Sequence, residues 1–71
     1  MRTVEDHQGA SWQVAVSKES YGALFLLFCR DSDNQCRRYI VNEETLLQAE
    51  QALVNMTQTA LQDALSEAEP L

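Results

Sequence analysis

Flexible and chain-breaking residues are scarce in this sequence of 71 residues, which contains two glycines and one proline. Disordered chains are poor in apolar residues, whereas 45% of the residues here are hydrophobic. The composition therefore excludes a disordered chain and favours a single small folded domain. A domain of this length buries only about 60% of its unfolded surface, and such domains often depend on a covalent staple or a partner.

Residues that carry catalytic or metal chemistry are also few: one histidine, His7, and two cysteines, Cys29 and Cys36. A structural zinc site needs four ligands, and nucleophilic catalysis needs a base beside the nucleophile. We therefore expect a protein that is not an enzyme and that binds no metal and no cofactor. The two cysteines frame a turn. In a reducing cytoplasm we expect ordinary thiols, although a register that places them directly opposite each other would permit a cross-strand disulfide.

Long apolar runs are missing, because the longest, Ala23–Cys29, has seven residues and a membrane span needs about 20. No N-terminal segment has the pattern of a secretory signal, so we expect a cytoplasmic protein without membrane contact. Cations are missing from residues 39–71, which hold six acidic residues. All five cations lie in residues 1–38 beside five acids, so the net charge of −6 comes from the second half.

What the sequence does have is an apolar run, Ala23–Cys29, without a polar residue in either register of a strand. Both faces of such a strand need cover. Segments 12–17 and 36–41 on either side also have the pattern of strands, and polar turns separate the three. The pattern predicts a three-stranded antiparallel meander. Residues 1–11 are polar and aperiodic, so we expect a flexible N-terminal tail before a domain over residues 12–71.

The hydrophobic period changes from 2 to 3.6 at Asn42, and no glycine or proline follows until Pro70. Asn42 is a suitable N-cap, and the apolar spacing predicts one long amphipathic helix over residues 43–67. The expected fold is therefore α+β with the order β-β-β-α and the helix packed on one face of the sheet. A helix of this length is longer than such a sheet, so its last turns would overhang.

An apolar sheet face without cover and an overhanging helix end together predict a protein–protein interface. Two-fold homodimers are the commonest closed assemblies, so we expect a homodimer or a contact with another protein. The residues predicted to lie in this interface are Phe25, Phe28, Leu61, Leu65 and Ala68.

Two alternatives stay open at this stage. A sheet that carries Arg37, Arg38 and Tyr39 is of the kind that stacks single-stranded nucleic acid bases, but the acidic net charge weighs against this partner. The acidic helix, with Glu50 and Asp63, is also suited to the basic groove of a partner protein, as an acidic decoy.

Overall fold

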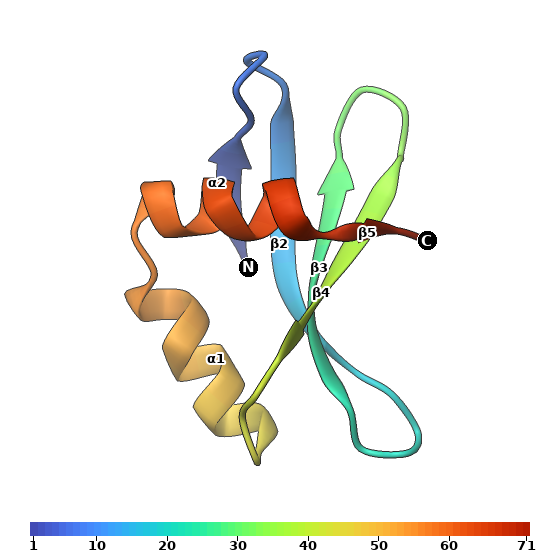
Figure 1. Ribbon diagram of the computed structural model, residues 1–71, viewed down its shortest axis with the longest axis vertical. Helices are drawn as coiled ribbons and strands as arrows, with labels where there is room; N and C mark the ends of the chain where they lie inside the picture. The colour runs from blue at the N-terminus through green and yellow to red at the C-terminus, as the bar shows by residue number, and fades with distance from the viewer.

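The computed structural model describes residues 1–71 and contains a five-stranded antiparallel sheet and two helices (Figure 1). The strands lie side by side in chain order: β1 (Arg2–Glu5), β2 (Ser11–Lys18), β3 (Leu24–Arg30), β4 (Cys36–Val41) and β5 (Glu69–Pro70). Helices α1 (Leu46–Asn55) and α2 (Gln58–Glu67) lie between β4 and β5 in the sequence. The fold is α+β with an antiparallel sheet. The predicted three-stranded meander with one long helix is wrong, because two further strands are present and the helix is divided.

Strand β1 occupies the segment that was predicted to be a flexible tail. Its residues pair with the first half of β2, and Val4 lies in the core with 1% of its surface exposed. The turn that follows is organised by Asp6, whose carboxylate accepts the backbone N–H groups of Gln8 and Ala10 at 2.9 Å. A four-residue strand with one buried side chain shows no period in the sequence, and therefore only the pairing with β2 reveals it.

Strand β5 is still shorter. Glu69 and Pro70 pair with Arg38 and Arg37 of β4, and the N–H of Leu71 donates to the carbonyl of Cys36 at 3.1 Å. A pair of residues that includes a proline carries no strand signal of its own. The sheet therefore gains its last strand only after the helices have brought the chain back to β4.

The helix predicted over residues 43–67 is interrupted at Met56 and Thr57. Thr57 has an extended backbone, and its hydroxyl accepts the N–H of Ala60 at 3.0 Å, so it forms the N-cap of α2. Thr45 caps α1 in the same way through the N–H of Gln48. The interruption turns α2 across the sheet, whereas α1 runs obliquely beside it (Figure 1). The predicted overhang of one straight helix is therefore absent.

The core lies between the helices and one face of the sheet. Its strand residues are even-numbered, since alternate side chains of a strand point to the same face. The other residues of the core come from the two helices and the C-cap of α2. The ten buried residues of this cluster are Val4, Trp12, Val14, Leu26, Phe28, Leu53, Leu61, Ala64, Leu65 and Ala68. The odd-numbered side chains of β1, β2 and β3 and the even-numbered side chains of β4 form the opposite face, which no helix covers.

Candidate protein-interaction surface

The residues predicted to meet a partner are all buried within the chain itself. Four of them, Phe28, Leu61, Leu65 and Ala68, belong to the core cluster. Phe25 lies on the uncovered sheet face, yet only 3% of its surface is exposed. The helix residues are buried because α2 packs along the sheet instead of extending past it. A surface for a partner therefore has to be formed by other residues.

The side of strands β2, β3 and β4 that faces away from the helices is left uncovered, and we call it the open face. The register aligns its side chains in three rows across the strands. The rows are Ser17–Phe25–Ile40, Ala15–Leu27–Arg38 and Gln13–Cys29–Cys36. Arg38 is the only charged residue among these nine, and Ile40 is the most exposed of the apolar ones, at 66%.

Arg38 and Phe25 form a contact that shapes the centre of the open face. The guanidinium carbon of Arg38 lies 5.2 Å from the centroid of the Phe25 ring, within the range of a cation–π interaction. The long Arg38 side chain thus helps to shield the ring, while its charge stays at the surface. Leu27 and Ile40 are left as the apolar side chains that a partner can reach.

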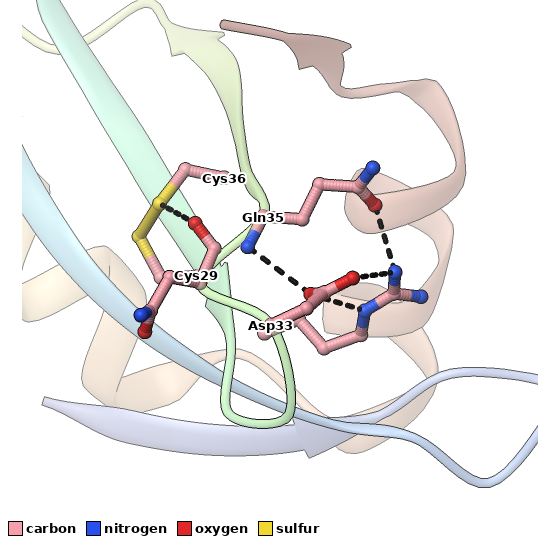
Figure 2. Close-up of a disulfide and its surroundings, with 6 residues drawn as sticks. Cys29, Asp33, Gln35 and Cys36 are labelled. Atoms are coloured by element: carbon pink, nitrogen blue, oxygen red, sulfur yellow. Dashed lines mark hydrogen bonds and ion pairs between the residues drawn. A yellow bond between two sulfur atoms is a disulfide. The ribbon is translucent and has the colours of Figure 1, made fainter.

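A disulfide joins Cys29 and Cys36 at one end of the open face (Figure 2). The two residues lie directly opposite each other in the β3–β4 register, with 4.1 Å between their Cα atoms. The structure contains the cross-strand bond in place of the ordinary thiols that were expected. The pairing depends on register, because a shift by one residue would place the sulfur atoms on opposite faces.

The turn beyond the disulfide carries Asp33 and Gln35 (Figure 2), and Arg30 holds it through hydrogen bonds to both. The Nε and NH2 groups of Arg30 donate to the two carboxylate oxygens of Asp33 at 3.0 and 2.7 Å, and NH2 also donates to the side-chain oxygen of Gln35. The hydrogen bonds from Arg30, followed by the N–H of Gln35, lower the pKa of Asp33 below its ordinary value. The Asp33 carboxylate is therefore already occupied within the chain.

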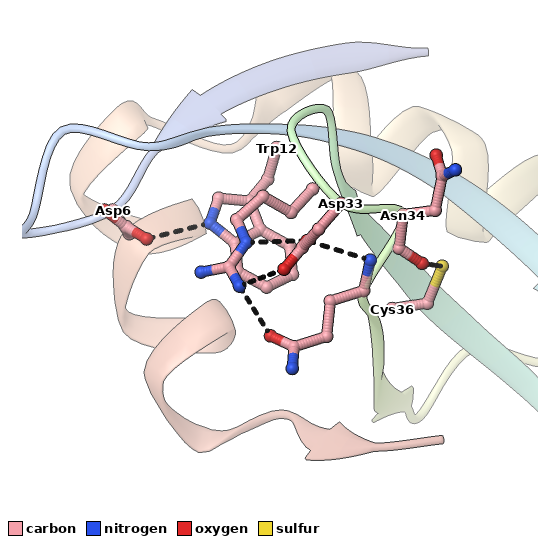
Figure 3. A network of polar contacts seen from close by, with 7 residues as sticks. Asp6, Trp12, Asp33, Asn34 and Cys36 are labelled. Atoms are coloured by element: carbon pink, nitrogen blue, oxygen red, sulfur yellow. Dashed lines mark hydrogen bonds and ion pairs between the residues drawn. The ribbon is translucent and has the colours of Figure 1, made fainter.

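On the helix side, Trp12 lies at the centre of a polar network (Figure 3). Its ring is contacted by the guanidinium groups of Arg30 and Arg37, at 5.3 and 4.9 Å from the centroid. Its indole N–H donates to Asp6 at 2.9 Å. This bond is the largest cause of the lowered pKa of Asp6, and the hydrogen bond from the N–H of Ala10 is the second. These contacts fix the buried tryptophan at the end of the sheet.

A small hollow of about 190 Å³ lies beside this network, and Asp6, His7, Arg30, Arg37 and Ser66 contribute to its lining. The Ser66 hydroxyl donates to the carbonyl of Gln62 at 3.0 Å, and no hydrogen bond joins it to His7. Nucleophilic catalysis would require such a bond between a nucleophile and a base. Asp6, Arg30 and Arg37 make contacts that hold the fold.

The residues of the nucleic-acid alternative do not share one surface. Arg37 and Tyr39 point toward the helices, where Arg37 donates to the carbonyl of Leu65 at 3.4 Å and Tyr39 packs against the core. Arg38 points the other way, onto the open face. Strand alternation thus separates the basic cluster that is continuous in the sequence.

The remaining site classes and the comparisons add no further candidate. No three His, Cys, Asp or Glu side chains lie close enough together to hold a metal ion. Neither helix has the length and apolar character that crossing a bilayer requires. Comparison with protein-family models, with curated proteins and with solved structures found no match. The open face, with its single charge and its exposed Ile40, is the surface on which a functional proposal can be based.

Proposed function

We propose that this protein is a non-enzymatic interaction module, and that its open face packs against the open face of a second copy. The observation that carries the proposal is the charge pattern of this face. Nine side chains from three strands include one charge, in a chain with a net charge of −6. Two acidic molecules repel each other least where they meet through their least charged surfaces.

The positions of the acidic residues support the same arrangement. Glu50 lies on α1, and Asp63 and Glu67 lie on α2, all exposed and on the helix side of the sheet. Pairing through the open faces keeps these carboxylates on the outer sides of the dimer. At the rim, Arg38 and Glu69 are cross-strand neighbours, and a two-fold contact allows Arg38 of one copy to meet Glu69 of the other.

The proposal is tested by the variant Ile40→Glu, with Leu47→Glu as its matched control. Both residues are exposed aliphatic side chains, at 66% and 64%, but Ile40 lies on the open face and Leu47 on α1. Light scattering after size exclusion, over a series of protein concentrations, reports the mass of the particle. We expect a dimer for the parent chain and for Leu47→Glu.

We expect Ile40→Glu to weaken self-association by about tenfold or more, since a two-fold contact places the new charge in the interface twice. A parent chain that stays monomeric up to high micromolar concentration contradicts the proposal. Equal behaviour of the two variants contradicts it as well. Circular dichroism of both variants shows whether the fold is unchanged, which their exposed positions lead us to expect.

A further inference from the structure

The edges of this sheet are protected unequally. Edge strands present unpaired backbone groups, and proteins normally cover or block them. Along β1, the outward carbonyls of Thr3 and Glu5 accept hydrogen bonds from the side chains of Gln58 and Gln62 at 3.1 and 2.8 Å. At the opposite edge, β5 contains Pro70, which has no N–H to offer to a further strand.

The second half of β2 has no such protection. β1 pairs only with Ser11–Val14, so residues 15–18 of β2 have β3 on one side and no strand on the other. We call this stretch the free edge.

The direction of the backbone groups along the free edge follows from the register. Thr3 and Glu5 point their carbonyls away from β2, so the bonded pairs between β1 and β2 are those of Trp12 and Val14. The same alternation along β2 turns the N–H and C=O groups of Val16 and Lys18 away from β3. These groups therefore face the side on which no strand lies.

A hollow of about 340 Å³ lies beside the free edge, between Val16 and helix α1. Its α1 wall includes Leu53, which is buried, and Val54, of which 71% is exposed. Arg2 also borders the hollow, but its guanidinium group donates to the carbonyls of Leu53 and Met56. Met1 lies at the same hollow with its α-amino group, and Glu50 contributes the one carboxylate of a lining that is otherwise mostly apolar.

We propose that the free edge binds an extended peptide of a partner protein, which adds to the sheet antiparallel to β2 and in line with β1. Main-chain hydrogen bonds to Val16 and Lys18 would give affinity, and alternate side chains would give specificity. The lining fits a segment that alternates apolar residues with a lysine or arginine facing Glu50. A second copy of this chain fits less well, because its own free edge is flanked by its own α1. This surface is separate from the open face.

The probe for the test is the synthetic peptide acetyl-Thr-Val-Thr-Lys-Thr-Val-Thr-amide, which places valine and lysine on one side of a strand. Amide hydrogen exchange followed by NMR then locates the bound peptide on the protein. We expect exchange to slow at Val16 and Lys18, whereas Ala15 and Ser17, whose backbone groups face β3, stay unchanged. Protection at Ile40 on β4 instead, or no protection at any strand amide, overturns the proposal.

Two matched pairs of changes test the contacts separately. N-methylation of the peptide at its valine and lysine residues removes the N–H groups that face β2, and we expect binding to weaken about tenfold or more. N-methylation at the threonines leaves these groups intact, so binding is expected to persist. In the protein, Val54→Lys is expected to weaken binding to a similar extent, while Leu47→Lys on the same helix leaves it unchanged. Equal effects within either pair overturn the proposal.

Discussion

At the scale of single residues, the arginines are held within the chain. Arg2 donates to the carbonyls of Leu53 and Met56 at the end of α1, and Arg37 donates to Leu65 near the end of α2. Neither helix has a basic residue in its own last turn. The strands thus supply the positive charge that the C-terminal end of a helix favours. Because these cations serve the fold, the helix surface stays acidic.

Asp6 is one of two carboxylates that accept three hydrogen bonds, the other being Asp33. Asp6 accepts the Trp12 indole N–H and the backbone N–H groups of Ala10 and Gln8. These bonds favour the charged carboxylate and lower the pKa of Asp6 from its ordinary value of 3.8. Since the folded-state pKa lies below the unfolded one, the stabilisation is present above pH 3.8 and is lost as the pH falls through the folded-state pKa.

We expect Asp6→Asn to lower the melting temperature at neutral pH and to make stability less dependent on pH in the acid range. The reason is that the amide still accepts hydrogen bonds but carries no charge to be neutralised by acid. Thermal unfolding followed by circular dichroism between about pH 2 and pH 7 measures both effects. Asp63→Asn is the control, since Asp63 is exposed and makes no side-chain hydrogen bond. An identical acid response in both variants would contradict the role given to Asp6.

At the scale of elements, the division of the helical region decides how the core is filled. Leu53 on α1 and Leu61 and Leu65 on α2 are all buried against the sheet. One straight helix follows a single line, whereas the sheet is broad and twisted, so a change of direction lets both helical segments bury their apolar residues. Thr57 makes the change possible because its hydroxyl replaces the backbone partner that the N–H of Ala60 lacks at a helix start.

We expect Thr57→Ala to destabilise the fold by about 1 kcal/mol, which is typical for the loss of an N-cap hydroxyl. Urea unfolding at neutral pH measures the difference. Thr59→Ala is the matched control, because Thr59 is an exposed residue of the same helix and its side chain makes no hydrogen bond. A loss of equal size in the control would contradict a stabilising role for the Thr57 cap.

Two glutamines of α2 protect the edge strand β1. On sequence grounds Gln58 and Gln62 belong to a polar helix face that meets water. In the structure they donate to the outer carbonyls of β1 and thereby cover the edge of the sheet. The same protection does not reach the free edge of β2, because α2 crosses the sheet beside β1 (Figure 1).

At the scale of the whole molecule, charge is distributed by side. The helices carry Glu50, Asp63 and Glu67 without a cation. On the other side of the sheet, Arg38 is the one charge of strands β2 to β4, and Glu5 and Glu69 lie on the flanking strands β1 and β5. A molecule with a net charge of −6 repels its own copies at long range, and this repulsion is screened by salt. Self-association through the open face should therefore depend on ionic strength in a defined direction.

We expect the dimer to become tighter when ionic strength rises from about 0.01 M to about 0.15 M, because the Debye length falls from about 30 Å to about 8 Å. Sedimentation equilibrium at both salt concentrations measures the change. The opposite result, dissociation by salt, would indicate that ion pairs hold the copies together. In that event the apolar residues of the open face would not be what holds the two copies together.

The parts of this protein that could be predicted are those that local patterns encode. Alternation at Trp12, Val14 and Val16 identifies β2, and the apolar run Ala23–Cys29 identifies β3 as the central strand. The candidate surface was predicted less well. Phe28 and Leu65 were expected at an interface and are core residues, because the number of elements available to cover the sheet was underestimated.

The sequence by itself determined that the protein is an α+β domain with an antiparallel sheet and an acidic C-terminal half. The hydrophobic period, the composition and the charge of a segment can each be read from that segment without knowing what it contacts. Only the tertiary structure decided that Cys29 meets Cys36, that Arg38 shields Phe25, and that β1 leaves half of β2 free. These features depend on strand register and on contacts such as the one between Gln58 and Thr3. Residues so far apart in the chain share no local period, and folding alone brings them together.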